Sequence, residues 1–138
     1  MSELIDTNII FYSLDDRDPV KHTVAKKILK RAFIEGAVVS TQNLAEFFYQ
    51  SKKKFSPENL ETSRSLALAI LGSELIEKVS YTENTMSKCI FKCKKEHDFW
   101  DLVIYYTMLE NGITTIITEN ESDFEGLKGI KIINPFKL

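Results

Sequence analysis

The chain has 138 residues, 43% of them hydrophobic, and a formal net charge of -2 at pH 7. This length and hydrophobic content suit one ordinary domain, and no uncharged apolar run approaches the roughly 20 residues that a membrane span needs. A charge so near zero does not favour a protein that coats nucleic acid over its whole surface. The N-terminus lacks a basic stretch followed by an apolar one. We therefore expect a single domain over residues 1–138 that is cytoplasmic and not bound to a membrane.

The first half of the chain alternates short apolar runs with longer helical patterns. In chain order we expect a strand at 2–5, helices at 9–13 and 19–35, a strand at 37–40 and a helix at 41–53. Asp18 followed by Pro19 is typical of a helix start, and Gly36 is typical of a helix end. Ser40 or Thr41 is the expected cap of the helix that follows the second strand.

The second half of the chain continues this alternation. The expected elements are helices at 56–72, 82–95 and 99–110, and strands at 75–79, 114–118 and 131–133. Strands that are short, nearly continuously apolar and separated by helices favour a parallel sheet covered on both faces. The sequence therefore predicts a three-layer α/β/α fold of the α/β class.

Four carboxylates stand where apolar segments break off, namely those of Asp6, Glu46, Asp101 and Asp123. Three of them fall on the carboxyl side of a predicted strand, where open parallel sheets bind their ligands. Asp101 is the only charge in residues 99–109, a helix that is apolar all round, so it needs a helix N-terminus or a cation to stabilise it. Carboxylates that converge raise each other's pKa, and such a group usually implies a bound metal.

Each acid also has a plain structural interpretation. Asp6 could simply cap the helix that follows it. Glu46 could belong to a solvated helix face together with Gln42 and Asn43, and Asp123 could be an ordinary exposed loop acid. Taken singly, these positions leave both interpretations open.

Five short motifs occur along the chain in a particular order. They are Asp6-Thr7-Asn8, Leu44-Ala45-Glu46-Phe47, Phe99-Trp100-Asp101, Thr118-Glu119-Asn120 and Ile132-Ile133-Asn134-Pro135-Phe136. In this order and spacing the sequence resembles a PIN domain. More narrowly, it is similar to the VapC-type toxins of bacterial and archaeal toxin–antitoxin pairs, and the resemblance covers residues 6–136.

The resemblance implies a metal-dependent endoribonuclease built on a four- or five-stranded parallel sheet. It identifies Asp6, Glu46 and Asp101 as the three core acids, with Asp123 as the fourth, for both catalysis and metal binding. The implied cofactor is Mg²⁺, for which Mn²⁺ would substitute. Oxygen-bound Mg²⁺ can activate water and compensate charge on a phosphodiester, so the chemistry agrees with the acids.

The resemblance also assigns supporting residues. Asn8 and Thr118 would hydrogen bond the acids and orient them. Many relatives carry Asp where Asn120 stands, so Asn120 is expected to act as a supporting or water-mediated partner, and Glu119 is a reserve candidate. This departure leaves open whether one or two metal ions bind.

Substrate and partners are expected from both charge and resemblance. Three basic groups could hold RNA phosphates, and they are Lys26, Lys27, Lys30 and Arg31; Lys52, Lys53 and Lys54; and Lys88, Lys92, Lys94 and Lys95. Phe47, Phe48 and Tyr49 could stack bases, although core packing is favoured for the two phenylalanines. The resemblance implies a small antitoxin protein as partner.

A homodimer is expected because the chain has nine phenylalanines, five tyrosines and one tryptophan, and unburied apolar patches usually mark interfaces. The side chains that suggest this are Phe11, Tyr12, Phe47, Phe48, Tyr49 and Phe55.

Other classes of protein fit less well. A haloacid-dehalogenase-like phosphatase would need an Asp where Asn8 stands, and a nucleotide-binding module would need a Gly-rich loop. The remaining alternative is a catalytically weak or dead PIN-like protein that binds RNA or protein.

Overall fold

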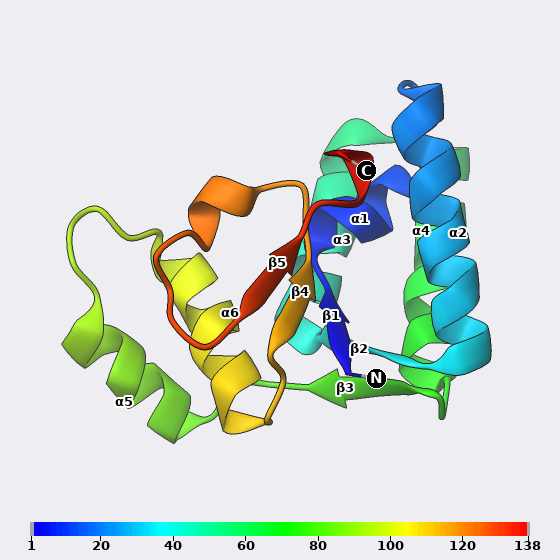
Figure 1. Cartoon of the computed structure of the whole chain (residues 1–138). Coiled ribbons are helices and arrows are strands. Elements are labelled where there is room, and N and C mark those ends of the chain that lie inside the picture. Colours follow the sequence, from blue (N-terminus) through cyan, green and yellow to red (C-terminus); the bar gives the residue numbers. More distant parts are fainter. Residues whose placement is uncertain (1, 138) are drawn as a thin grey trace.

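Five short parallel strands form the centre of the computed structural model, which describes residues 2–137 (Figure 1). They are β1 (Glu3–Ile5), β2 (Ala37–Ser40), β3 (Ile76–Val79), β4 (Thr115–Ile117) and β5 (Lys131–Ile133). Their order in the sheet is β3-β2-β1-β4-β5, and every neighbouring pair is parallel. The chain builds the sheet outward from β1 to β3 and then returns to add β4 and β5 on the other side of β1. The topological switch point therefore lies between β1 and β4, where such sheets bind ligands.

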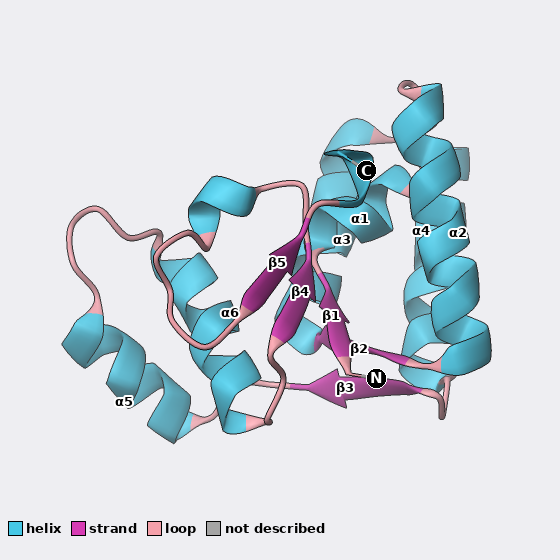
Figure 2. Cartoon of the chain, viewed as in Figure 1, coloured by secondary structure: helices cyan, strands magenta, loops and turns pink. Residues whose placement is uncertain are grey.

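Helices cover both faces of the sheet (Figure 2). They are α1 (Thr7–Tyr12), α2 (Pro19–Glu35), α3 (Thr41–Lys54), α4 (Pro57–Gly72), α5 (Glu83–Lys92) and α6 (Phe99–Glu110), with short 3-10 helices η1 (Glu121–Asp123) and η2 (Pro135–Lys137). Helices α1 to α4 pack on one face, and α6, backed by α5, packs on the other. The predicted three-layer architecture is confirmed, with five strands.

Successive strand residues bury their side chains on opposite faces of the sheet. Leu4 and Ile116 pack toward α6, whereas their neighbours Ile5 and Ile117 pack toward α1 to α4. All four side chains are buried. This two-sided burial explains why the strands read as continuous apolar runs instead of alternating ones.

Most predicted helix boundaries agree with the structure. Asp18 and Ser40 cap α2 and α3 through their side chains, and Gly36, with φ 97°, ends α2. Helix α1 begins at Thr7, two residues earlier than expected, because Asp6 caps it. Helix α5 ends at Lys92, not near Lys95.

The early end of α5 has a visible local cause. The residues after Cys93 form a turn in which the backbone N–H of Lys94 donates to His97 Nδ1 at 3.1 Å. The His97 N–H in turn donates to the Lys94 carbonyl at 3.0 Å. This turn positions the start of α6. Among residues 2–137, no helix combines the length and hydropathy that crossing a bilayer requires.

Candidate active site

Asp6 lies at the carboxyl end of β1, at the switch point, and its side chain is buried. Its Oδ1 accepts hydrogen bonds from the Thr7 backbone N–H at 2.8 Å and from Asn43 Nδ2 at 3.1 Å. Its Oδ2 accepts from Thr118 Oγ1 at 2.7 Å and from Asn8 Nδ2 at 3.2 Å. A carboxylate has about four acceptor positions, so these donors hold Asp6 in one orientation.

The pKa of Asp6 is the result of opposing effects. Burial raises it above its ordinary value, the hydrogen bond from Thr118 lowers it, and the charge of Asp123 raises it further. Asp6 is also the N-cap of α1, so the structural interpretation of this residue holds together with its place at the sheet edge. Asn8 and Thr118 hydrogen bond to Asp6 and also to each other at 3.2 Å.

Asn43 is completely buried, with a side chain that is 0% exposed. Its amide Nδ2 donates to Asp6 and also to Thr7 Oγ1 at 3.1 Å, and its Oδ1 accepts from Ser40 Oγ at 2.8 Å. The interpretation that places this residue on a solvated helix face is therefore wrong. The available signal was its spacing, because Asn43 stands three residues before Glu46 and so shares its helix face.

Glu46 lies on α3, one turn after Asn43, and is partly buried. Its Oε1 accepts a hydrogen bond from Thr7 Oγ1 at 3.2 Å. Burial raises the pKa of Glu46, the Thr7 hydrogen bond opposes this, and the charge of Asp6 adds to it. Thr7 thus connects the two acids through one hydroxyl.

Asp101 lies in the first turn of α6, whose N-cap is Asp98. The Asp98 Oδ1 accepts from the backbone N–H groups of Trp100 at 2.9 Å and Asp101 at 3.1 Å. Burial raises the pKa of Asp101 to about 7, with further contributions from the negative charges of Asp98, Asp123, Asp6 and Glu46, in that order. The predicted acids therefore lie close enough to repel one another, as expected for convergence.

Asp123 ends η1 and is exposed. It lines a cavity of about 310 Å³ together with Asp98 and Asp101, and burial and then the charge of Asp98 raise its pKa. Glu46 instead lines a second cavity, of about 370 Å³, that also contains Trp100. The four acids gather at one edge of the sheet, but the expectation of a single cavity common to all of them holds only in part.

Glu119 and Asn120 follow β4 and lie beside this group. The carboxylate of Glu119 forms an ion pair with Lys21, and its backbone N–H donates to Asn8 Oδ1 at 3.1 Å. Asn120 is exposed, and its backbone N–H donates to Thr118 Oγ1 at 3.0 Å. Glu119 is thus already engaged by a cation of the chain, which makes it a poorer candidate ligand than the other acids.

The donor set suits a hard divalent cation, since all the candidate groups are carboxylates. Within residues 2–137, however, no group of three or more acidic, histidine or cysteine side chains is arranged to hold a metal ion as it stands. All the lone pairs of Asp6 are occupied by hydrogen bonds, whereas no side chain in that range donates to the Asp101 carboxylate. The residues therefore fit such a cation by chemistry and charge, and Asp101 is the candidate ligand with free oxygens.

Sequence reasoning missed Asp98, whose charge acts on both Asp101 and Asp123. Its position just before a predicted helix is the usual signal of an N-cap, and that signal was present. The partly exposed pair Tyr81 and Trp100 was also missed, because only the fold brings the start of α5 to the start of α6.

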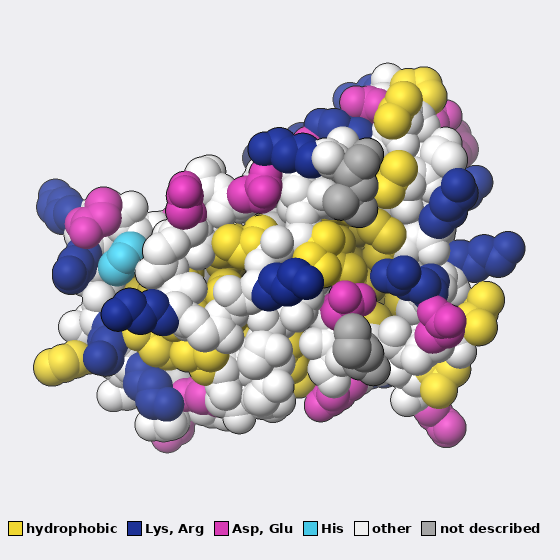
Figure 3. All heavy atoms as spheres, viewed as in Figure 1, with side chains coloured by type: hydrophobic (Ala, Val, Ile, Leu, Met, Phe, Trp, Pro, Cys, Tyr) yellow, Lys and Arg dark blue, Asp and Glu magenta, His cyan; other side chains and the backbone are white. Residues whose placement is uncertain are grey.

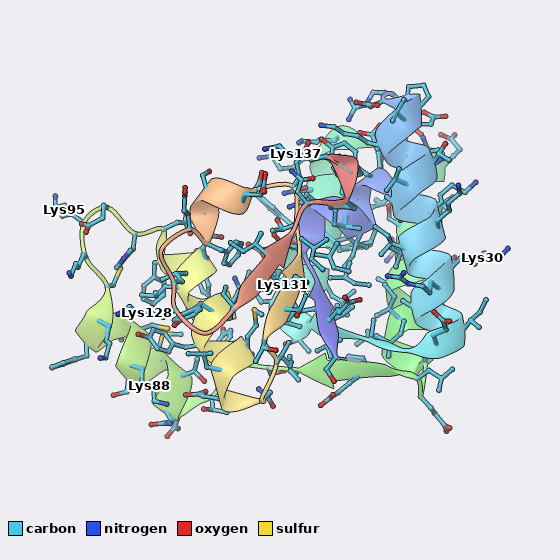
Figure 4. All side chains as sticks on the ribbon, in the orientation of Figure 1. Lys30, Lys88, Lys95, Lys128, Lys131 and Lys137 are labelled. Atoms are coloured by element: carbon cyan, nitrogen blue, oxygen red, sulfur yellow. The ribbon has the colours of Figure 1, made fainter. Side chains whose placement is uncertain are left out.

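The basic groups do not form one rim around the acids. Lys30 projects outward from α2, whereas Lys88 and Lys95 lie on α5 and on the loop after it, at the other end of the molecule (Figure 4). On the face drawn in Figure 3, Lys and Arg side chains are likewise spread over both ends. The loop after α5 also carries Glu96 and His97, which line the cavity of Asp101 and Asp123. Its lysines, Lys94 and Lys95, are therefore next in sequence to residues of this cavity.

Comparison with known proteins identifies the family. The model of the PIN domain family matches residues 4–129, so the chain belongs to the PIN domain family, as its motifs predict. No curated protein sequence matches the chain.

Several solved structures share the fold over nearly the whole chain. One is a toxin–antitoxin complex from Klebsiella pneumoniae, with 21% identity and a TM-score of 0.66, covering 96% of this chain and 97% of that one. Another is VapC20 from Mycobacterium tuberculosis, a Sarcin-Ricin loop cleaving toxin, with 14% identity, a TM-score of 0.65, and coverage of 93% and 98%. A third is FitAcB from Neisseria gonorrhoeae, with 18% identity, a TM-score of 0.69, and coverage of 99% of each chain. At these identities the similarity establishes the fold.

Proposed function

We propose that this chain is a single PIN nuclease domain that hydrolyses RNA phosphodiester bonds with the help of Mg²⁺, for which Mn²⁺ would substitute. The observation that carries this proposal is the gathering of acids at the switch point, where burial and then the charges of four other carboxylates raise the pKa of Asp101 to about 7. Such uncompensated charge is typical of a site built for a cation. Membership of the PIN family and the fold shared with VapC20, a Sarcin-Ricin loop cleaving toxin, support the reaction class.

In this proposal each acid has a distinct task. A bound cation supplies an activated water and compensates the charge that develops on the phosphate oxygens. Asp101, Glu46 and Asp123 offer carboxylate oxygens, and Asp6 is the fourth acid, fixed by its donors. Burial and the neighbouring acids raise the pKa of Asp101 to about 7, so a cation held by this carboxylate would compete with a proton and bind more weakly as pH falls.

We further propose that the chain is the toxin of a type II toxin–antitoxin pair, acts in the cytoplasm, and is inhibited by a small antitoxin protein. The proposal rests on the fold shared with the toxin–antitoxin complex from Klebsiella pneumoniae and with FitAcB. A basic side chain of such a partner could bind the acids directly, since an Arg guanidinium offers carboxylates a two-pronged hydrogen bond.

A homodimer also stays a proposal, but several of the aromatic side chains that suggest it pack inside the fold. Phe11 and Phe47 are buried in the core, Phe55 stacks on Phe11 with ring centroids 4.8 Å apart, and Tyr12 contacts Phe136. These aromatic residues are therefore used within the fold. Among the predicted side chains Tyr49 is exposed, and exposed apolar side chains elsewhere include Val20, Ile34, Leu68, Leu71, Ile90 and Phe91.

A catalytically weak or dead PIN-like protein is the second candidate. It is favoured by the saturated hydrogen bonding of Asp6 and by the lack of a ready group of three ligands within residues 2–137. The two candidates differ in whether a cation binds and RNA is cut.

The deciding experiment compares purified protein with Mg²⁺, with Mn²⁺ and with EDTA on a panel of single-stranded and hairpin RNAs, alongside calorimetric titration with Mn²⁺. We expect metal-dependent cleavage that EDTA stops and that Asp101→Asn abolishes. Glu74→Gln is the matched control, because Glu74 is exposed and precedes β3, at the opposite edge of the sheet. Absence of both Mn²⁺ binding and cleavage would leave the binding module as the function.

A further inference from the structure

A cleft of about 370 Å³ opens at the carboxyl edge of the sheet, next to the acids. It is lined by Thr41, Gln42, Ala45, Glu46, Tyr81 and Trp100. These residues come from the start of α3, from the loop between β3 and α5, and from the first turn of α6. Three segments far apart in the sequence therefore build one concave surface at this edge.

Two aromatic side chains form the apolar part of the cleft. Tyr81 is 41% exposed and Trp100 is 47% exposed, and their ring centroids lie 6.3 Å apart with the planes inclined by 55°. Phe99 contacts Trp100 edge-on, with centroids 5.5 Å apart. The indole is thus supported by a neighbour while it keeps much of its surface open to solvent, unlike Phe47, which is fully buried.

Hydrogen bonds fix the walls of this cleft. Gln42 Nε2 donates to the Trp100 carbonyl at 3.1 Å, which ties α3 to the start of α6. The hydroxyls of Thr41 and Ser80 lie 2.7 Å apart and hydrogen bond, which ties α3 to the loop that carries Tyr81. A cleft whose walls are already connected loses little freedom when a ligand enters it.

The cleft and the acidic site share residues. Glu46 lines the cleft and is also one of the proposed ligands, and Trp100 immediately precedes Asp101. A flat group held against Tyr81 and Trp100 would therefore have its attached backbone beside the acids. Polar groups in the wall, including the Thr41 hydroxyl and the Gln42 amide, match the hydrogen-bonding edges of a nucleobase.

We propose that the cleft binds one unpaired nucleobase of a single-stranded RNA and thereby places the adjoining phosphate at the acids. This inference rests on the proposed nuclease function and adds a subsite to it. Aromatic side chains stack on bases of any sequence because every base has a π-face. The subsite therefore selects for an unstacked, single-stranded base more than for a particular sequence. Phe47 packs in the core, as favoured from the sequence, and this proposal gives the stacking role to Tyr81 and Trp100.

The test uses Trp100, which is the only tryptophan of the chain, as its own reporter. Intrinsic fluorescence is followed while a six-nucleotide single-stranded RNA is added, in EDTA, to the wild type and to Asp101→Asn, which has less negative charge. We expect saturable quenching by the RNA and little quenching by an abasic oligomer of equal length. Tyr81→Ala should weaken RNA binding about tenfold or more. Phe91→Ala should not, since Phe91 is 87% exposed on α5 and outside the cleft.

Four results would overturn the subsite. One is equal quenching by the abasic oligomer, the second is unchanged affinity in Tyr81→Ala, and the third is no saturable quenching in either protein. The fourth is evidence that a second copy of the chain occupies the cleft. In that case the fluorescence would change with protein concentration alone, and the protein would have a dimer mass that Tyr81→Ala abolishes. Cleavage that persists while the subsite test fails leaves the nuclease proposal intact. Quenching without Mn²⁺ binding or cleavage instead identifies a base-binding module that is not a nuclease.

Discussion

The two sides of the acidic edge are built in opposite ways. On one side, Asp6 is buried and each of its carboxylate oxygens accepts two hydrogen bonds. On the other side, Asp101 faces Asp98 and Asp123 across a cavity, and within residues 2–137 no side chain donates to its carboxylate. Hydrogen bonds from the fold compensate the charge of Asp6, whereas the charge of Asp101 repels the neighbouring carboxylates. The Asp6 side therefore supplies rigidity, and the Asp101 side holds negative charge that a cation would neutralise.

The largest expected effect tests the repelling side. Asp101→Asn should lower RNA cleavage by more than about a hundredfold, because it removes a carboxylate ligand, and even supporting residues of metal sites cost 10–100-fold. Its free energy of unfolding should stay the same or rise, because the replaced charge was destabilising. Single-turnover cleavage and urea unfolding measure the two quantities. A variant that unfolds more easily but keeps its activity per folded molecule would show that Asp101 serves the fold.

The rigid side is tested through Asn43, which connects Asp6, Thr7 and Ser40. Asn43→Ala should lower the free energy of unfolding by about 2 kcal/mol, since it leaves buried acceptors without their donor. It should also lower cleavage, because Asp6 loses one of the groups that orient it. Asn59→Ala is the matched control, because Asn59 is exposed in the first turn of α4. Equal unfolding midpoints for the two variants would refute the role of Asn43 as a connecting residue.

Prediction from sequence succeeds where local patterns determine the structure. The bounds of α2, β2, α6 and β5 agree with expectation, because their caps, glycines and apolar runs are local signals. The three proposed core acids could be selected from the sequence because each stands at a strand end or in the first turns of a helix. Where α5 ends could not be predicted, since a turn involving His97 decides it.

The parts of the site that escaped prediction depend on contacts between distant segments. Asn43 is buried only because α1 packs on α3 and brings Asp6 to it. Tyr81 and Trp100 meet only because β3 lies beside β2, at one edge of the sheet, and α6 starts nearby. A single sequence carries no signal of such pairings, so the polar network and the aromatic cleft required the fold.

A smaller effect would connect the acids to a cation directly. Free Mn²⁺ at ten times its Kd should raise the free energy of unfolding by about 1.4 kcal/mol, since it binds only the folded state. Asp101→Asn should lose most of this gain, whereas Glu74→Gln should keep it. Thermal unfolding with and without Mn²⁺ measures the difference. Equal stabilisation of all three proteins would place the Mn²⁺ away from Asp101.

The smallest expected effect concerns pH in the absence of metal. The pKa of Asp101 is about 7 in the folded protein, against an ordinary 3.8. Between these values the folded chain keeps a proton that the unfolded chain has released, so the stability contributed by this group is lost as pH rises from about 4 to about 7. After allowance for solvent screening of this partly exposed group, the loss should be about 1 kcal/mol.

The pKa of Asp15 is shifted in the opposite direction, so Asp15 serves as an internal control. The hydrogen bond from Arg17 lowers the pKa of Asp15, and its contribution is therefore present above pH 3.8 and is lost only as pH falls below it. Denaturant unfolding in EDTA between pH 4.5 and 8 should thus report Asp101 and not Asp15. The wild type should become less stable across this range, and Asp101→Asn should show a flatter profile. Parallel profiles of stability against pH for the wild type and Asp101→Asn would mean that the fold already relieves the repulsion between Asp101 and its neighbouring acids without a cation. Asp101 would then be compensated by the fold, just as Asp6 is.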